Sequence, residues 1–234
     1  MHTLDYIVLF LSVFVGSFIA FYFKNISNKT TKLLISFSGA YLFGITVIHL
    51  IPETFNTSNN HVIGVFVLVG FLLQILLEQF SKGVEHGHGH IHGNVSFTIL
   101  LGLSIHSFIE GMPLGAAHHI HDHTHDSLLS AIVLHKIPVS IVLTHLLIES
   151  KMKTPQIILL LIFFAITTPL GSFVSHYISN VSTYHHQIMA IVIGMFLHIS
   201  TTILFESSDG HQFNSRKTIA IILGSGIALI STFL

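Results

Sequence analysis

Residues 104–115 read SIHSFIEGMPLG and residues 134–140 read LHKIPVS. Both stretches lie in long apolar segments, yet they carry ionisable side chains, namely His106, Glu110, His135 and Lys136. A charged side chain at the centre of a membrane helix costs about 2.5–3.5 kcal/mol on insertion scales, so it marks an ion or proton path by default. His106 and Glu110 are four residues apart and would share one helix face, about 6 Å apart. Imidazole and carboxylate groups together suit zinc and similar divalent metals.

The composition predicts a protein built for lipid. Of 234 residues, 51% are hydrophobic and 8% are charged, against about 25% charged in soluble domains. The absence of cysteine excludes disulfides, thiolate metal sites and cysteine nucleophiles. A formal charge of −1 and the lack of a basic patch argue against a nucleic-acid partner. Twenty histidines point instead to metal or proton handling.

Eight apolar segments are long enough to cross a bilayer, which needs roughly 20 residues per helix. We therefore expect an all-α membrane protein with a single transmembrane domain over residues 1–234. The first segment has no positive n-region and no cleavage site, so we expect it to be retained. Small residues in the last segment (Gly224, Ser225, Gly226 and Ala228) favour close helix packing. The segments are residues 5–23, 33–52, 62–80, 94–117, 128–148, 156–178, 188–205 and 217–234.

The basic residues predict the orientation of the segments. Eight of the nine lie in the connections after segments one, three, five and seven, and the ninth is Lys136. Because cytoplasmic loops carry an excess of lysine and arginine, those connections should face the cytoplasm and both termini should face outside. We expect a multi-pass integral membrane protein, in the plasma (inner) membrane if the source is bacterial.

This orientation assigns the two histidine-rich connections to opposite sides of the membrane. Residues 81–93 would be cytoplasmic and residues 118–126 external. Flexible His/Asp tracts hold metals loosely by chelation, which predicts metal capture or sensing; the alternative is a solvated polar loop that binds metal incidentally. The candidate capture residues are His86, His88, His90 and His92 inside, and His118, His119, His121, His123 and His125 outside.

Prolines adjoin the ionisable residues. Pro113 lies between Gly111 and Gly115, and Pro138 follows His135 by three residues. Proline removes a backbone donor and kinks a helix, and such breaks are tolerated in membranes where they line protein or a water-filled cavity. Thr167 and Thr168 precede Pro169; they could line a path or cap a kink, and we favour capping.

These motifs resemble those of the ZIP (Zrt/Irt-like) family of divalent-metal transporters. Its fourth span reads His-Asn-x-x-(Asp/Glu)-Gly, against HSFIEG at residues 106–111, and its fifth often reads His-Glu-x-Pro-His-Glu, against HKIPVS at 135–140. HLIPE at 49–53 and TPLG at 168–171 resemble patterns in spans two and six. The resemblance implies that spans four and five hold the metal. It also implies elevator-type transport toward the cytoplasm, with spans one, four, five and six moving against the others, usually in a homodimer.

The departures from the family pattern predict one metal rather than two. Ser107, Lys136 and Thr168 stand where the family's second ion finds its ligands, and Val139 replaces another usual ligand. This resembles a branch with His-Lys-x-Pro in span five. The resemblance leaves His106, Glu110 and His135 as metal ligands. Water, or a histidine that the sequence cannot place, would complete the site; the candidates are His49, His145 and His198.

Zinc suits a His/His/Glu site best, with iron, manganese and cadmium as alternatives. It would be the transported ion and not a cofactor. Three other functions compete. A cation-diffusion exporter has paired Asp/His motifs on spans two and five, but residues 33–52 hold no aspartate. An intramembrane zinc hydrolase could use an open metal position, but no His-Glu-x-x-His motif is present. A metal receptor would bind the ion without flux.

Overall fold

The computed structural model describes residues 3–23, 27–57, 59–81, 83–84, 97–115, 122–177, 183–205, 215–231 and 233, and over these it is helical without strands. The all-α prediction is therefore confirmed for the described residues. The helices are α1 (Thr3–Tyr22), α2 (Asn28–Ile45), η1 (Thr46–Leu50), α3 (Ile51–Thr54), α4 (Asn60–Ser81), α5 (Phe97–Gly115), α6 (Asp122–Glu149), α7 (Thr154–Tyr177), α9 (His185–Phe205) and α10 (Ser215–Ile230).

Seven helical stretches in the described chain are long and apolar enough to cross a membrane. The second of them joins α2, η1 and α3 and runs through Lys29–Thr54. The last helix, α10, has 16 residues, which at 1.5 Å per residue is about 24 Å, shorter than a hydrocarbon core of about 30 Å. The predicted eighth span therefore stays a prediction.

The ends of the helices differ from the expected segments by a few residues, and two of these differences bear on the local structure. The fifth span begins at Asp122 and not at residue 128, because the helix extends into the histidine-rich segment. The second ends at Thr54 and contains a five-residue π-helix, η1, directly before α3, with Pro52 in the first turn of α3. Proline lacks an N–H and clashes with the carbonyl four residues earlier; directly before Pro52, the N–H of Ile51 donates to the carbonyl of Thr46, five residues back. Three further helices (α5, α6 and α7) continue through their internal prolines, Pro113, Pro138 and Pro169.

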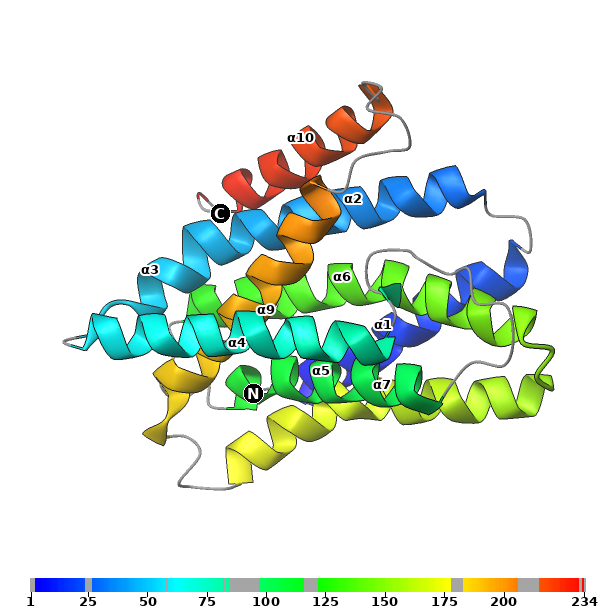
Figure 1. Cartoon of the computed structure of the whole chain (residues 1–234), viewed down its shortest axis with the longest axis horizontal. Coiled ribbons are helices and arrows are strands. Elements are labelled where there is room, and N and C mark those ends of the chain that lie inside the picture. The colour runs from blue at the N-terminus through cyan, green and yellow to red at the C-terminus, as the bar shows by residue number, and fades with distance from the viewer. Residues whose placement is uncertain are drawn as a thin grey trace.

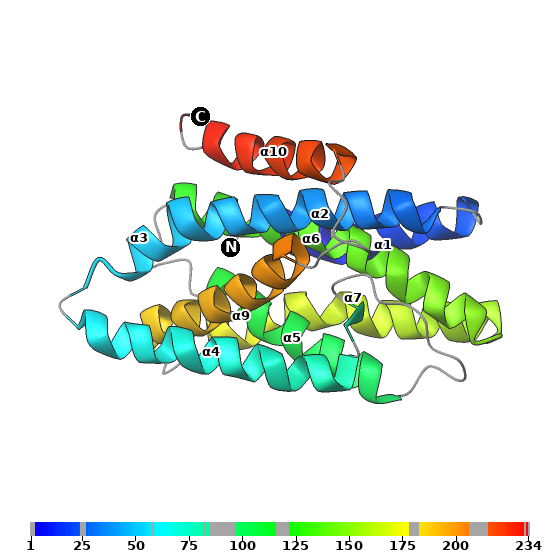
Figure 2. The same cartoon turned by 45° about the horizontal axis from the view of Figure 1, so that its top comes forward.

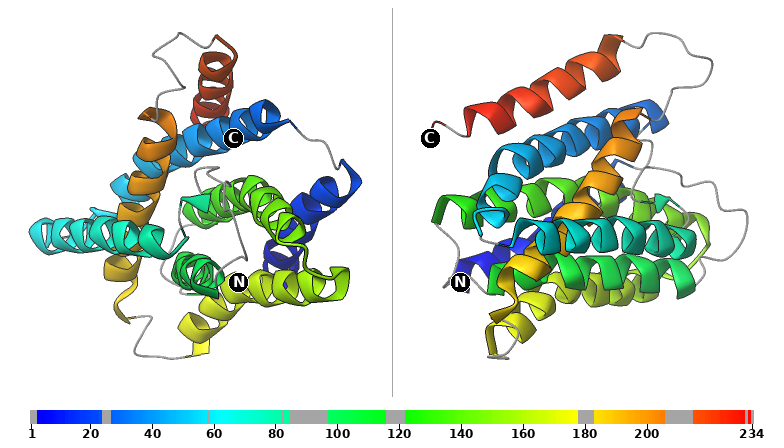
Figure 3. Two further views of the ribbon diagram at one scale, coloured as in Figure 1. Left: turned by 45° about the vertical axis from the view of Figure 1, so that its right-hand side comes forward. Right: turned by 60° about the vertical axis from the view of Figure 1, so that its left-hand side comes forward.

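The helices form two groups (Figures 1 and 2). In one, α5 packs along α7 and α1 packs along α6; in the other, α4 packs along α9 and α2 along α10. The left view of Figure 3 shows the first group gathered on one side, with the second group arranged along the other. The first group corresponds to spans one, four, five and six, the bundle that the resemblance implies. Contacts of α2 with α6 and of α4 with α5 join the groups.

Small residues bring helices together within and between the groups. A Cβ on Gly111 of α5 would collide with the carbonyl oxygen of Thr168 on α7, and one on Gly171 with that of Phe108. The backbones of α5 and α7 therefore touch next to Glu110. Glycine also permits close packing of α10 on α2, because a Cβ on Gly224 would strike the carbonyl of Phe37. The prediction of close packing for the last segment is confirmed at that position.

Candidate functional site

Glu110 lies on α5 at the centre of the first group and its side chain is 2% exposed. Three polar side chains surround the carboxylate. Lys136 of α6 forms an ion pair with Oε1, and the Thr168 hydroxyl of α7 donates to the same oxygen at 3.1 Å. His106, one turn earlier on α5, places Nε2 3.2 Å from Oε2. The helical spacing thus predicted the His106–Glu110 pair correctly.

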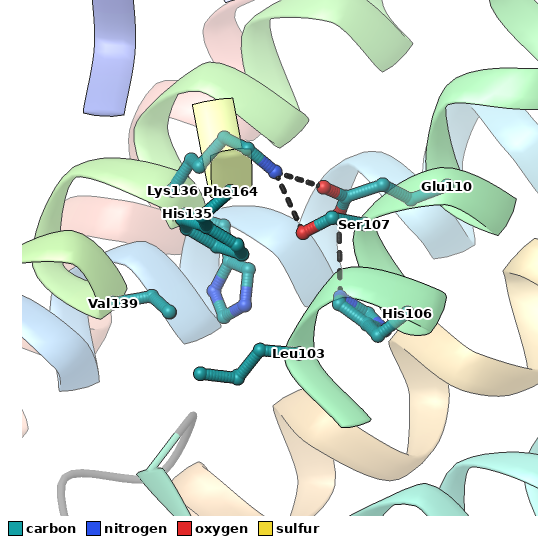
Figure 4. A pocket seen from close by; sticks show the side chains of 8 residues that line it. All are labelled: Leu103, His106, Ser107, Glu110, His135, Lys136, Val139 and Phe164. Carbon is teal, nitrogen blue, oxygen red and sulfur yellow. Dashed lines mark hydrogen bonds and ion pairs between the residues drawn. The ribbon is translucent and has the colours of Figure 1, made fainter. Parts of the chain in front are cut away.

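Lys136 is also fully enclosed, at 2% exposure. Its ammonium donates to Glu110 and, at 3.0 Å, to the Ser107 hydroxyl. It also lies 5.0 Å from the centroid of the Phe164 ring on α7, within the range of a cation–π interaction. An anion, a hydroxyl and an aromatic face therefore hold this cation inside the protein, as Figure 4 shows. Snorkelling to an interface is excluded by these contacts.

His135 precedes Lys136 on α6 and faces the same cavity as His106 (Figure 4). The two imidazole rings are 6.4 Å apart between centroids and meet edge to face at 78°. Both histidines are 3% exposed. The residues that line the cavity are Leu103, His106, Ser107, Glu110, His135, Lys136, Val139 and Phe164.

The predicted ligands thus meet at one cavity, but they do not converge on one point. Among the described residues, no three His, Asp or Glu side chains are spaced to hold an ion. At Glu110 the Lys136 ammonium contacts Oε1, and His106 faces Oε2. A three-ligand site at His106, Glu110 and His135 therefore stays a prediction, and it requires these side chains to move closer together than they lie here.

The candidates for a fourth ligand lie elsewhere in the described structure. His49 is half-buried in η1, and His145 is half-buried near the end of α6. His198 of α9 contacts Glu78 of α4 at 2.7 Å through Nε2. None of the three lines the cavity around Glu110.

Most of the histidine-rich segments fall outside the described residues, namely His86, His88, His90, His92, His118, His119 and His121. The remaining two belong to the first turn of α6. His123 is exposed, but His125 is 9% exposed and its Nε2 lies 3.7 Å from Oδ2 of Asp5 on α1. His125 is therefore a buried helical residue, not part of the expected flexible loop.

Thr167 and Thr168 have different partners. Thr167 donates to the carbonyl of Phe164 at 2.7 Å, within its own helix, and so bonds to its own backbone and not to the carboxylate; capping of the kink at Pro169 stays a prediction for Thr167. Thr168 donates to Glu110, so capping is wrong for Thr168, which lies beside the site where the family motif placed it. The reason is the glycine contact of α5 with α7, which brings this hydroxyl to the carboxylate.

Sequence reasoning missed one polar residue of the site. Gln74 of α4 is fully buried, and its Oε1 lies 3.0 Å from Nδ1 of His106. A signal was present, because Gln74 is the one amide or charged side chain between His61 and Glu78 in an otherwise apolar segment, and polar groups in membrane helices face the protein interior.

Comparison with known proteins identifies the family. Residues 82–232 match the family model described as the ZIP zinc transporter. The chain belongs to the ZIP family. With its long apolar helices, it is a multi-pass integral membrane protein. The matched stretch includes α5, α6 and α7, which carry the cavity, but not α4.

Curated relatives of low sequence identity agree with this family assignment. The chain is 27% identical over 175 residues to Protein zntD of Dictyostelium discoideum, covering 64% of this chain and 25% of that protein. It is 29% identical over 176 residues to Zinc transporter 3 of Oryza sativa subsp. japonica, covering 62% and 48%. Zinc transporter 5 of the same plant matches at 29% over 129 residues, covering 47% and 36%. The chain thus spans between a quarter and about half the length of these relatives.

Proposed function

We propose that this ZIP-family protein transports a divalent metal ion, with zinc as the first candidate, through the cavity between α5 and α6. The observation that carries the proposal is a buried carboxylate, Glu110, facing two imidazoles and held by an internal cation, Lys136. Family membership and relatives named as zinc transporters support it. The ligands would be His106, Glu110 and His135.

Lys136 gives the empty protein a stable, neutral site. An unpaired buried carboxylate would carry a large desolvation cost, which the lysine ammonium offsets through its contact with Glu110. His106 faces the other oxygen, Oε2, and in this scheme an ion bound there takes over from Lys136 the compensation of the Glu110 charge. In this scheme the empty site returns across the membrane without net charge, and the lysine excludes a second ion beside Ser107. We therefore propose one metal per chain, consistent with the His-Lys-x-Pro variant of span five.

The division into two helix groups supports alternating access by movement of α1, α5, α6 and α7 against the others. We propose this elevator-type movement, inward net transport and a homodimer as the family resemblance implies. The protein would be a carrier and not an enzyme. Iron, manganese or cadmium would compete with zinc for the same His/His/Glu ligands.

The histidine-rich segments at residues 81–93 and 118–126 are proposed to capture or sense metal outside the transport site. His123 is exposed and fits this role, whereas His125 faces Asp5. Replacing the histidines of these segments other than His125 by serine should change the apparent affinity for zinc. Complete loss of flux at saturating zinc would place those residues in the permeation site instead.

The deciding experiment is uptake of several metals into proteoliposomes that contain the purified protein. Time-dependent zinc accumulation that His135→Ala abolishes, with unchanged expression, is the expected result. Zinc binding without flux would favour a metal receptor, and turnover of a lipid or peptide would favour a hydrolase. Full wild-type flux in the His135→Ala protein would overturn the proposed ligands.

A further inference from the structure

Gln74 meets the site from the second helix group. It lies on α4, while the proposed ligands lie on α5 and α6. It also lies before residue 82, outside the stretch that matches the family model. Its side chain is fully buried, and its amide oxygen contacts His106.

The packing of α4 on α5 explains how this amide reaches the imidazole. A Cβ placed on Gly102 would lie only 3.1 Å from the carbonyl oxygen of Leu77 and from Cβ of Phe80. The two helices therefore approach closely at this turn. His106 is one turn beyond Gly102, and Gln74 is one turn before Leu77, so the next turn of the same contact brings the two side chains together.

The contact determines which nitrogen of His106 faces the cavity. An amide oxygen only accepts hydrogen bonds, so with Oε1 at 3.0 Å the hydrogen belongs to Nδ1. Nε2 then points toward Glu110, 3.2 Å from Oε2, a distance at which a hydrogen on Nε2 would bond to the carboxylate, so the ion replaces that hydrogen when it binds. A metal-binding histidine needs one nitrogen free of hydrogen, and a partner on the other nitrogen orients the ring and raises its basicity.

We propose that Gln74 is a positioning residue of the metal site, which orients His106 and holds it in the tautomer that presents Nε2 to the ion. This inference rests on the proposed function, because it presumes that His106 is a ligand. An amide suits the position because it is uncharged and adds nothing to the balance between Glu110 and Lys136. Leucine would fill much of the same volume but could not accept the hydrogen bond.

The test is zinc affinity of the full-length protein, with the histidines in residues 85–92 and 118–123 replaced by serine so that titration reports the membrane site. Zinc is titrated against a competing chelator, and this parent protein must still take up zinc. Gln74→Leu should weaken binding by about 10–100-fold, the usual effect of losing such an outer partner. Gln74→Glu keeps an acceptor and should bind at least as tightly as the parent. The matched control is Gln79→Leu, an exposed position on the same helix, which should bind like the parent.

A double-mutant cycle separates positioning of His106 from a general structural role. Once His106→Ala has removed the ligand, adding Gln74→Leu should weaken zinc binding no further. Two outcomes overturn the inference but leave the metal site in place. In one, Gln74→Leu lowers the zinc affinity of the His106→Ala protein by the same factor as it lowers that of the parent; in the other, the Gln74→Leu single variant binds zinc like the parent. If His106→Ala itself binds zinc like the parent, the proposed ligand set fails.

A second variant keeps the inference testable if Gln74→Leu does not fold. Gln74→Asn retains the amide but is one methylene shorter, so its oxygen no longer reaches Nδ1. Weakened zinc binding in Gln74→Asn, with Gln74→Glu unaffected, supports the assignment. Parent-like affinity in Gln74→Asn overturns it.

Discussion

Glu110 and Glu78 are both carboxylates on apolar helices, and each has a basic partner from another helix. Glu110 is 2% exposed and is held by Lys136, Thr168 and His106. The Glu78 side chain is 26% exposed, and His198 contacts it at 2.7 Å. The first pair is enclosed by three helices of one group, whereas the second joins α4 and α9 of the other.

The difference lies in what remains when the acid is removed. The side chains of Glu78 and His198 are 26% and 12% exposed, so water can reach either group when its partner is removed. Lys136 has almost no exposure through which water could solvate its ammonium. In the pair of Glu110 with Lys136, each charge therefore depends on the other for its stability. The proposed function requires this, because the metal ion takes over the compensation of the Glu110 charge.

The largest expected effect comes from breaking the enclosed pair. Glu110→Gln keeps the shape of the side chain but removes the charge, so zinc uptake should be abolished. Lys136 would also be left buried and uncompensated, which typically costs about 3–5 kcal/mol. Glu78→Gln is the matched control and should retain uptake. Uptake into proteoliposomes and thermal unfolding in detergent measure the two effects.

A compensating change sharpens this comparison. Adding Lys136→Met to Glu110→Gln removes the unpaired charge, so thermal stability should recover while uptake remains absent. Equal losses of uptake in Glu110→Gln and Glu78→Gln would show that the enclosed carboxylate has no special role.

The second-largest expected effect comes from disturbing the close contact of α5 with α7 that encloses Glu110. In Gly111→Ala the new methyl would collide with the backbone of α7 at Thr168, and overpacking of this kind costs about 1–3 kcal/mol. We expect lower thermal stability and impaired uptake, because α7 must move away from Glu110. Gly226→Ala on α10 is the control, since nothing lies within 4 Å of its Cβ position. Parent-like behaviour of both variants would contradict the close contact of α5 with α7.

A third prediction concerns the number of ions. The Lys136 ammonium contacts both Ser107 and Glu110, where a second divalent ion would find its ligands according to the family pattern. At about 4 Å and an effective dielectric of 20, repulsion amounts to roughly 4 kcal/mol per unit charge pair. With the loop histidines replaced by serine, the parent should bind one zinc ion per chain. Lys136→Glu combined with Ser107→Asn should raise this toward two, and a parent that already binds two would refute the role of Lys136.

Local rules predicted the part of the site that lies on one helix. The spacing of four residues placed His106 and Glu110 together, and the family motifs pointed to Ser107 and Lys136 as neighbours. The ion pair of Lys136 with Glu110 depends on how α6 packs against α5, and the spacing of residues along one helix does not predict that packing. The sequence therefore predicted that the lysine would offset the charge of the buried Glu110, but the direct contact of the two side chains came only from the packing of α6 on α5.

Residues brought in from other helices were harder to predict. Gln74 stood out as a lone amide in an apolar segment, but nothing in the segment says which helix it faces. For Thr168, the following Pro169 favoured capping of a kink, whereas the family motif placed it beside the metal site. Its hydrogen bond to Glu110 became evident only from the contact of α5 with α7 at Gly111. The start of α6 was placed too late because the polar residues before Ser127 resemble a loop, yet burial of His125 against Asp5 favours a helix there.

The smallest predicted effect separates two adjacent threonines. Thr168→Val removes a hydrogen bond to a carboxylate, and such bonds contribute about 1.5–3 kcal/mol, whereas Thr167→Val removes a bond to a neutral carbonyl, about 0.5–1.5 kcal/mol. Thr168→Val should therefore lower thermal stability more than Thr167→Val.

Thr168→Val should also raise the zinc concentration for half-maximal uptake, because Oε1 of Glu110 loses one of the two groups that orient it. Transport itself should persist, since His106, Glu110 and His135 are unchanged. Thr167→Val should leave that concentration unaltered, because its hydroxyl bonds within α7 and does not reach the carboxylate. If the two variants shift uptake equally, valine perturbs α7 near Pro169 and the Thr168–Glu110 bond is not what positions the carboxylate. A shift confined to Thr168→Val would show that the enclosure of Glu110, which Glu78 lacks, tunes the affinity of the site.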